Sequence, residues 1–160
     1  MDADRYARGQ TYAEYVSSIE GADRAALERR YAAVIIPPEV GGLKGLSHIR
    51  ALAVAEVWCG DCRVNLPILA RLSEIWGFQL RVVHKEDAAD LGIQRIPTFI
   101  FYTGGFQEVA RWIERPRQVA EVLSGSDEAA KPELRRRYML GEYAGATVSE
   151  LADLLGSARG

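Results

Sequence analysis

The sequence predicts an α/β fold in which a mixed four-stranded sheet is flanked by helices, with extra helices at both ends of the chain. Between residues 49 and 123, short apolar runs typical of strands alternate with stretches of helical period. The order strand, helix, strand implies a right-handed parallel crossover, and a later hairpin adds antiparallel strands to the same sheet. The sequence on either side of this segment carries helical patterns.

Length and composition indicate one ordinary domain. The chain has 160 residues, of which 48% are hydrophobic, so it can bury a sizeable core. We therefore expect a single domain over 1–160, with its core at about 49–123. An N-terminal helical extension is expected at 1–48 and a C-terminal one at 124–160.

Charge and hydropathy argue against two classes of partner. The net charge is -2 and the lysines and arginines are scattered, so neither nucleic acid nor an anionic membrane surface is an expected partner. The N-terminus is polar and charged, and no apolar stretch approaches the roughly 18 residues of a membrane span. These features predict a cytoplasmic protein.

The N-terminal extension carries two helix patterns. Thr11 and Glu14 have capping-box spacing ahead of an apolar stripe, which predicts a short amphipathic helix. A second helix is expected from about Asp23, with an apolar stripe that reaches Ile35 and ends at a pair of prolines. The segment 37–47 is rich in glycine and proline and predicts a loop.

The central segment supplies the strands of the predicted sheet. The nearly continuous apolar run at 49–58 is typical of a strand buried on both faces, and it ends at the cysteines. Leucines at helical spacing then predict a helix that closes at Gly77. Three later strands are expected at 78–85, 98–103 and 106–113. A short helix or loop follows the first of these strands, and a glycine turn joins the last two.

Three further helices are expected towards the C-terminus. The first runs over about 116–123. Pro132 suits the first turn of the second, while Thr147 and Glu150 have capping-box spacing at the start of a third helix that stops at Gly156. We expect the last two helices to pack on the outside of the domain.

The only cysteines of the chain, Cys59 and Cys62, lie where a buried strand is predicted to turn into a helix. Residues three apart on a first helical turn have side-chain origins about 5–6 Å apart, which is within disulfide range. The free amides and dipole of the helix N-terminus favour a thiolate at Cys59, whereas Cys62, one turn inside, is better shielded. The spacing therefore predicts a dithiol–disulfide cycle, in which Cys59 attacks a client disulfide and Cys62 resolves the mixed disulfide.

Two other interpretations of the cysteine pair remain open. The cysteines could be unconnected buried residues that happen to be neighbours. They could also bind zinc, but they supply only two of the four ligands of a structural site, and His48 and His84, to which we assign no role, lie at unsuitable spacing. A zinc site would need a dimer, so we expect no metal and no cofactor beyond the redox-active pair.

Three features resemble the thioredoxin family. Residues 58–62, WCGDC, are similar to its active-site signature, which usually has Gly-Pro between the cysteines. Residues 91–105 resemble the segment in which thioredoxins hold a cis-proline facing the disulfide, here Pro97. Pro67 stands eight positions after the first cysteine, where thioredoxins kink the active-site helix. The resemblance covers about 49–123 and implies a thioredoxin-like fold and thiol–disulfide exchange; a bacterial variant group with WCGDC and helical additions is similar in layout.

The same resemblance implies how a client disulfide is held. Pro97 would position the client, because a cis-proline leaves the preceding main-chain groups free to pair with a client strand. Ile96 would supply those main-chain contacts, and Trp58, Gly60 and Thr98 would complete the client surface. The alternative is an ordinary trans-proline at the start of an edge strand.

Two positions depart from the family pattern. Asp61 replaces the proline between the cysteines, and we expect its charge to raise the pKa of Cys59 and make the pair more reducing, with Arg63 offsetting part of the effect. Asp61 could instead be only a favourable first-turn residue of the helix. Ala53 stands where thioredoxins have a buried aspartate that assists deprotonation of the second cysteine. Glu56 is the nearest carboxylate and could transfer that proton through water, or be an exposed residue at a strand end.

These observations predict a cytoplasmic thiol–disulfide oxidoreductase that reduces the disulfides of client proteins or small molecules. Its electron donor would be a thioredoxin reductase or a low-molecular-weight thiol. A binding module is the alternative: the surface around Pro97 would then hold a partner protein, with little turnover.

Overall fold

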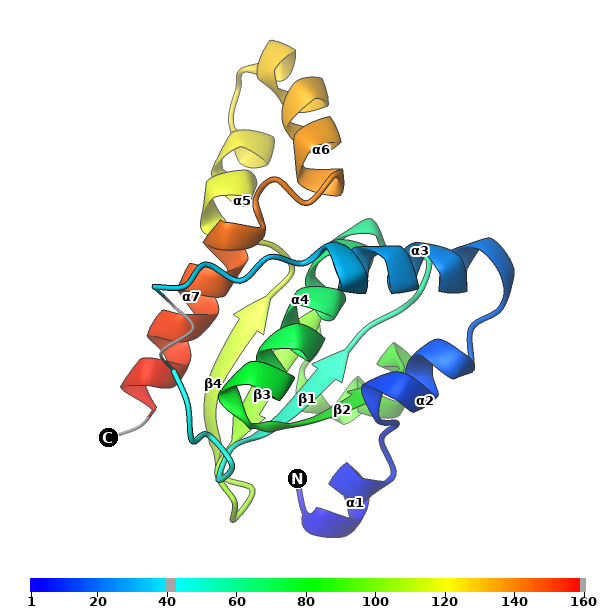
Figure 1. Ribbon diagram of the computed structural model, residues 1–160, viewed down its shortest axis with the longest axis vertical. Helices are drawn as coiled ribbons and strands as arrows, with labels where there is room; N and C mark the ends of the chain where they lie inside the picture. The colour runs from blue at the N-terminus through cyan, green and yellow to red at the C-terminus, as the bar shows by residue number, and fades with distance from the viewer. Residues whose placement is uncertain (40–42, 159–160) are drawn as a thin grey trace.

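Figure 1 shows the computed structural model, which describes residues 1–39 and 43–158; residues 40–42, in the loop expected at 37–47, lie outside the described residues. Within the described ranges the chain forms one four-stranded sheet, in the order β2-β1-β3-β4. β1 is parallel to β2 and antiparallel to β3, which is antiparallel to β4. The predicted mixed sheet is therefore confirmed. Its strands are β1 (Arg50–Val54), β2 (Gln79–Val83), β3 (Thr98–Tyr102) and β4 (Glu108–Ile113).

The two central strands are buried because their sequences are apolar on both faces. Every residue of β3 is buried, as are the last four residues of β1. In the register of the sheet, Ala53 lies between Val82 and Phe99. β1 is shorter than the apolar run at 49–58, and the residues after Val54 form the approach to the cysteines.

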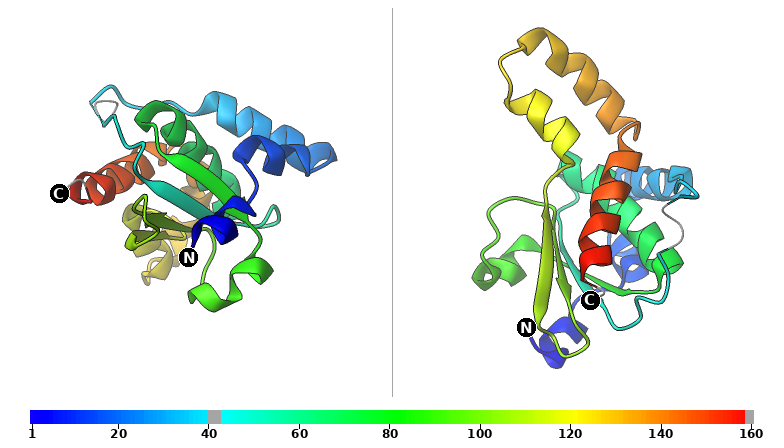
Figure 2. Two further views of the ribbon diagram at one scale, coloured as in Figure 1. Left: turned by 90° about the horizontal axis from the view of Figure 1, so that it is seen from below. Right: turned by 90° about the vertical axis from the view of Figure 1, so that its left-hand side faces the viewer.

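Helix α4 (Gly60–Trp76) covers one face of the sheet, and the views in Figure 2 show α3 and α7 on the same side. Its apolar side chains pack into the main core, where Trp76 is fully buried, and it ends at Gly77 in the left-handed region (φ 88°). The opposite face is covered by α1 (Ala3–Ala7) and by residues next to the 3-10 helix η1 (Lys85–Leu91). The sheet thus lies between two unequal helical layers.

The N-terminal helices follow the prediction in part. The capping box of Thr11 and Glu14 starts α2 (Tyr12–Ser17), as expected, whereas α1 was not predicted. Helix α3 (Gly21–Ala33) ends earlier than expected, and Ile35 is 80% exposed. The expected apolar stripe up to Ile35 is therefore wrong. The backbone already leaves helical geometry at Val34, the C-cap residue (ψ 123°), so Ile35 does not lie on the helix.

The C-terminal part contains α5 (Arg117–Ser124), the short 3-10 helix η2 (Glu128–Ala130) and α6 (Lys131–Met139). Helix α5 begins after Pro116, and α6 has a proline in its first turn, both as predicted. In Figure 1 these two helices stand away from the sheet as a hairpin. They form a small apolar cluster of their own with the start of α4, composed of Val64, Val119, Leu134 and Tyr138.

Helix α7 (Ala144–Ser157) differs from the prediction in two ways. It begins before Thr147, so the expected capping box with Glu150 is wrong; the Thr147 hydroxyl bonds to Asn65 and the Glu150 carboxylate accepts from Trp112 and from the amide of Arg117. It also does not lie outside the domain. Its apolar side chains at 148, 151 and 155 are buried in the main core against α4 and β4.

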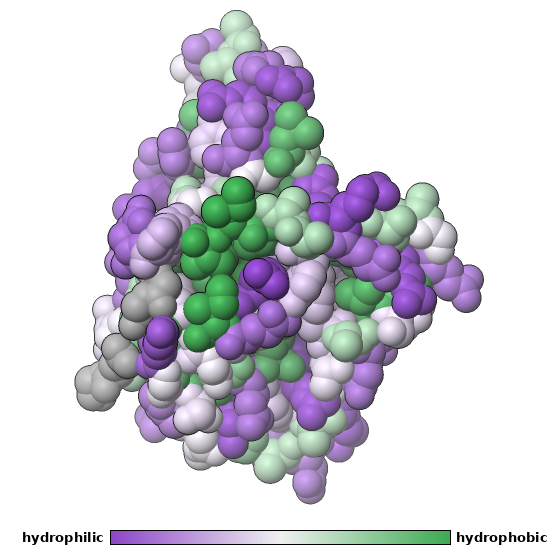
Figure 3. Space-filling model, viewed as in Figure 1, coloured by the Kyte–Doolittle hydropathy of each residue, from purple (hydrophilic) through white to green (hydrophobic). Residues whose placement is uncertain are grey.

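Two surface properties complete the description of the fold. Figure 3 shows an apolar area where the segment after α3 crosses the molecule, and the residues that line a hollow there include Val34, Ile35 and Leu140. Across the part of the chain that the structure describes, no helix combines the length and the hydropathy that crossing a membrane requires.

Candidate functional site

Cys59 and Cys62 lie at the N-terminus of α4, directly after the loop that follows β1. Cys59 is the N-cap residue, and its sulfur accepts a hydrogen bond from the Cys62 amide over 3.4 Å. Both cysteines are free thiols. Cys59 is partly exposed, whereas Cys62 is 2% exposed. Cys59 is therefore accessible to a reactant from solution, whereas Cys62 is shielded from solution.

The two sulfurs have opposite shifts in pKa. The hydrogen bond from the Cys62 thiol is the main cause that lowers the pKa of Cys59 to about 7, helped by the backbone amides of Cys62 and Asp61 and opposed by burial and the Asp61 charge. The same hydrogen bond and, second, burial raise the pKa of Cys62 above its ordinary value. The chain thus presents one thiol that ionises near neutral pH beside one that keeps its proton.

The segment before β3 lies against Cys59, although it is far away in sequence. The Ile96–Pro97 peptide bond is cis, and the Cys59 thiol donates to the Ile96 carbonyl over 3.6 Å. The hydroxyl of Thr98, the first residue of β3, donates to the Arg95 carbonyl over 2.6 Å, and Thr98 is only 2% exposed. The cysteine motif and the Pro97 segment, singled out separately in the sequence, therefore meet at one place.

Two motif residues differ strongly in their surroundings. Trp58 is 69% exposed, so its ring offers apolar surface next to Cys59. At Gly60 the Met139 side chain of α6 lies against the backbone, 3.5 Å from where a Cβ atom would stand. Access to the cysteine pair is therefore open on the Trp58 side and partly covered by α6 on the Gly60 side.

The Asp61 side chain has partners that the sequence did not suggest. It binds Nη2 of Arg115 through Oδ2 at 2.8 Å and accepts from the Tyr138 hydroxyl through Oδ1 at 2.9 Å. Arg63 was expected to offset its charge, but the Arg63 guanidinium instead pairs with Asp23 of α3 at 2.6 Å and donates to the Val57 carbonyl. The expectation for Arg63 is therefore wrong, because the helix turns its side chain towards α3.

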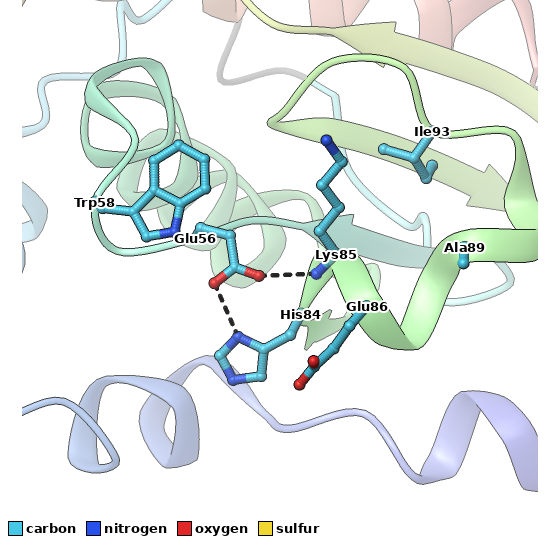
Figure 4. A pocket seen from close by; sticks show the side chains of 7 residues that line it. All are labelled: Glu56, Trp58, His84, Lys85, Glu86, Ala89 and Ile93. Carbon is cyan, nitrogen blue, oxygen red and sulfur yellow. Dashed lines mark hydrogen bonds and ion pairs between the residues drawn. The ribbon is translucent and has the colours of Figure 1, made fainter.

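Glu56 lies at the edge of an open groove beside Trp58, which Figure 4 shows. Its carboxylate accepts from the Lys85 amide over 2.9 Å and lies 3.2 Å from Nδ1 of His84. Only 17% of its side-chain surface is exposed, so Glu56 is not a freely exposed strand-end residue. Ala53 is fully buried, and its place in β1 carries no proton acceptor. His84, to which no role was assigned, is thus the partner of Glu56.

Comparison with known proteins identifies the family. A family profile described as thioredoxin matches residues 9–131 of the chain. The chain belongs to the thioredoxin family. A thioredoxin of Aspergillus fumigatus is 33% identical over 58 residues, which are 32% of this chain and 53% of that protein. The chain spans about half the length of this curated relative.

Two solved structures share the fold of this thioredoxin-family protein over almost the whole chain. A protein of unknown function from Pseudomonas aeruginosa has a TM-score of 0.79 at 20% identity, and the match covers 99% of both chains. An HIV epitope-scaffold has a TM-score of 0.77 at 19% identity, and the match covers 96% of both chains. Because both matches extend over nearly the whole chain, the terminal helices belong to the shared fold.

Three residues that lie around Asp61 were not identified from the sequence: Arg115, Tyr138 and Asn65. Arg115 and Tyr138 stand 54 and 77 residues from Asp61, and no local pattern links them to it. Asn65 did carry a signal, because it is a polar residue on the apolar side of a helix. Over the described residues, no group of three or more His, Cys, Asp or Glu is arranged to hold a metal ion.

The reactivity of this thioredoxin-family protein towards alkylating agents should follow the pKa of Cys59. Alkylation of the reduced protein by iodoacetamide is expected to rise with pH around a midpoint of about 7, because the thiolate is the nucleophile. Cys62 should stay unmodified through this range, since its pKa is raised and its sulfur is buried. Peptide mass spectrometry at a series of pH values measures both rates. A midpoint near the pKa of an ordinary cysteine, or faster labelling of Cys62, would contradict this expectation.

Proposed function

We propose that the protein is a thiol–disulfide oxidoreductase that reduces client disulfides through a cycle of Cys59 and Cys62. One observation carries the proposal: a partly exposed thiol with a pKa of about 7 lies within hydrogen-bonding distance of a buried second thiol and of the Ile96 carbonyl. This arrangement supplies a nucleophile, a resolving thiol and a main-chain acceptor at one place.

In the first step, the Cys59 thiolate attacks one sulfur of the client disulfide. A bond forms between Cys59 and that sulfur while the client S–S bond breaks, and the other client sulfur leaves as a thiolate that takes up a proton. Trp58 offers its exposed ring to the client, and the main chain of Ile96, next to Pro97, lies beside the reacting sulfur.

In the second step, Cys62 loses its proton and attacks the Cys59 sulfur. The Cys59–Cys62 disulfide forms, and the second client sulfur leaves, so the client gains two electrons and two protons. We assign the proton-transfer role to Glu56, acting through water, because position 53 is alanine. The Glu56 backbone amide also bonds to Cys62 and favours its thiolate. The rate at which a preformed mixed disulfide is resolved measures this step.

An external dithiol or thiol must return the oxidised pair to its reduced form, and a thioredoxin reductase or a low-molecular-weight thiol has the required chemistry. Reduction of clients, instead of their oxidation, is the direction expected in the cytoplasm, where thiols are kept reduced.

Equilibration with a redox buffer tests the proposed function. The protein is incubated in mixtures of reduced and oxidised glutathione, and free thiols are then blocked and counted by mass spectrometry. We expect a single transition from two free thiols to one intramolecular disulfide, together with reduction of insulin when dithiothreitol is the electron donor. A protein that shows no such transition would instead be a binding module that uses the surface around Pro97.

A further inference from the structure

The Asp61 carboxylate is fixed by two donors that come from other parts of the chain. Arg115 binds one oxygen and the Tyr138 hydroxyl binds the other. Only 17% of the Asp61 side chain and 22% of the Arg115 side chain are exposed, so solvent and salt screen this pair less than a pair at the open surface. Asp61 therefore differs from an ordinary acidic residue in the first turn of a helix.

The direction of the Tyr138 hydroxyl is set by Asn65. The Asn65 amide nitrogen lies 3.0 Å from the Asp61 carbonyl, 3.3 Å from the Glu114 carbonyl and 2.6 Å from the Tyr138 oxygen. Carbonyl groups only accept, so the NH₂ group must face them, and its two hydrogens are shared among the two carbonyls and the Tyr138 oxygen, which accepts as well. The phenolic proton is therefore free to point at Asp61.

The same network continues into the last helix. The Thr147 hydroxyl of α7 donates to Oδ1 of Asn65 over 2.9 Å, and Asn65 is fully buried. A chain of donors thus runs from α7 through α4 and α6 to the residue between the two cysteines. Tyr138 and Thr147 lie beyond residue 131, where the match to the family profile ends.

We propose that Tyr138 and Arg115 are positioning residues of the redox site, which hold the Asp61 carboxylate beside the cysteine pair and offset its charge. The C-terminal helices would thereby adjust the reactivity of Cys59 from outside the motif. The proposal rests on the proposed function only in its consequence for client reduction, because the positioning can be measured without a client.

Electrostatics gives the sign of the effect. The Asp61 charge raises the pKa of Cys59, since a negative charge disfavours a second one nearby. A guanidinium and a hydroxyl that point at the carboxylate reduce the field that reaches the sulfur. Removing either partner should therefore raise the pKa of Cys59 further, whereas removing the Asp61 charge should lower it.

Other ionisable groups also surround the cysteine pair, and they must stay constant in the test. Arg63 pairs with Asp23 of α3, and Glu56 pairs with His84. Tyr15 of α2 is buried, and burial first, then the charges of Cys62, Glu56 and Cys59, raise its pKa. None of these groups bonds to Tyr138 in the described structure, so a variant of Tyr138 leaves them in place.

A double-mutant cycle tests whether Tyr138 acts through Asp61. The pKa of Cys59 is taken from the pH profile of iodoacetamide alkylation in wild type, Tyr138→Phe, Asp61→Asn and the double variant. Tyr138→Phe should raise this pKa by about 0.5, which reduces the rate at pH 6 about threefold. In the Asp61→Asn background the same change should have no effect, because the charge it acts on is gone. An equal shift of the pKa in both backgrounds would overturn the proposal.

Two further variants separate positioning from a structural role. Arg115→Gln should raise the pKa of Cys59. Arg115→Lys should leave this pKa close to its wild-type value, since the lysine keeps the charge beside Asp61. Tyr143→Phe is the matched control, because Tyr143 belongs to the same apolar cluster and packs under Arg137 instead of bonding to Asp61. A shift in the Tyr143→Phe variant as large as in Tyr138→Phe would show a general packing effect and overturn the proposal.

These measurements need only the reduced protein and an alkylating agent. If insulin is not reduced while the cycle shows coupling, the proposed function fails and the positioning stands. If insulin is reduced and the cycle shows no coupling, the positioning fails and the proposed function stands.

Discussion

Replacing Cys59 by serine is expected to abolish disulfide reduction by the protein. Insulin should then be reduced only at the rate that dithiothreitol gives without the protein. A serine hydroxyl is not ionised near neutral pH and cannot form the mixed disulfide, so the first step of the cycle is lost. Turbidity of reduced insulin measures the effect. Because Cys59 is partly exposed and caps α4 through its sulfur, and serine is also a good N-cap residue, the variant should remain folded.

Replacing Cys62 by serine should have a different effect, although the two cysteines are only three residues apart. The Cys59 thiolate can still attack a client, but no second thiol is present to release the client, so the mixed disulfide accumulates. Non-reducing electrophoresis should then show client adducts that dithiothreitol removes. The serine hydroxyl can also donate to Cys59, so part of the lowered pKa should be kept. Full insulin reduction by the Cys59→Ser variant, or adducts in that variant, would contradict the cycle.

Much of the fold could be predicted from the sequence because its signals are local. The apolar runs of the strands, the helical spacing that ends at Gly77 and the turn residues each act within a few positions. The two parts of the site were also predicted one by one, from the cysteine spacing and from the segment around Pro97. That they meet follows from the order of the strands, since β1 and β3 are neighbours in the sheet.

The predictions that failed concern residues whose partners are distant in the sequence. Thr147 and Glu150 fit the capping-box pattern, but the same spacing occurs inside a helix, where tertiary contacts decide what each side chain binds. Arg63 is next to Cys62 in sequence, yet the partner of Asp61 is Arg115, which lies 54 residues further along the chain. A local sequence pattern cannot show which of several distant residues a side chain will contact.

Asn65 is expected to be among the most important polar residues for stability. It is fully buried, its amide nitrogen faces the Asp61 and Glu114 carbonyls and the Tyr138 oxygen, and its Oδ1 accepts from Thr147. Asn65→Leu keeps a similar volume but leaves the Glu114 carbonyl and the Thr147 hydroxyl without the partner that Asn65 supplies, and it removes a donor to the Tyr138 oxygen. We expect the free energy of unfolding to fall by about 2–4 kcal/mol. Gln118→Ala, at an exposed position of α5, is a control that should change it little.

The cost of Asn65→Leu should depend on whether Thr147 still carries its hydroxyl. Removing one partner of a buried hydrogen bond leaves the other unsatisfied, whereas removing both is less costly than the sum. Urea unfolding of Asn65→Leu, Thr147→Val and the double variant should therefore give a coupling free energy of about 1 kcal/mol or more. The slope of the free energy of unfolding against urea concentration should not change. Additive effects would mean that Thr147 and Asn65 stabilise the protein independently. The coupled result would instead show that α7 and α4 are joined through this hydrogen bond, next to Leu66 in the main core.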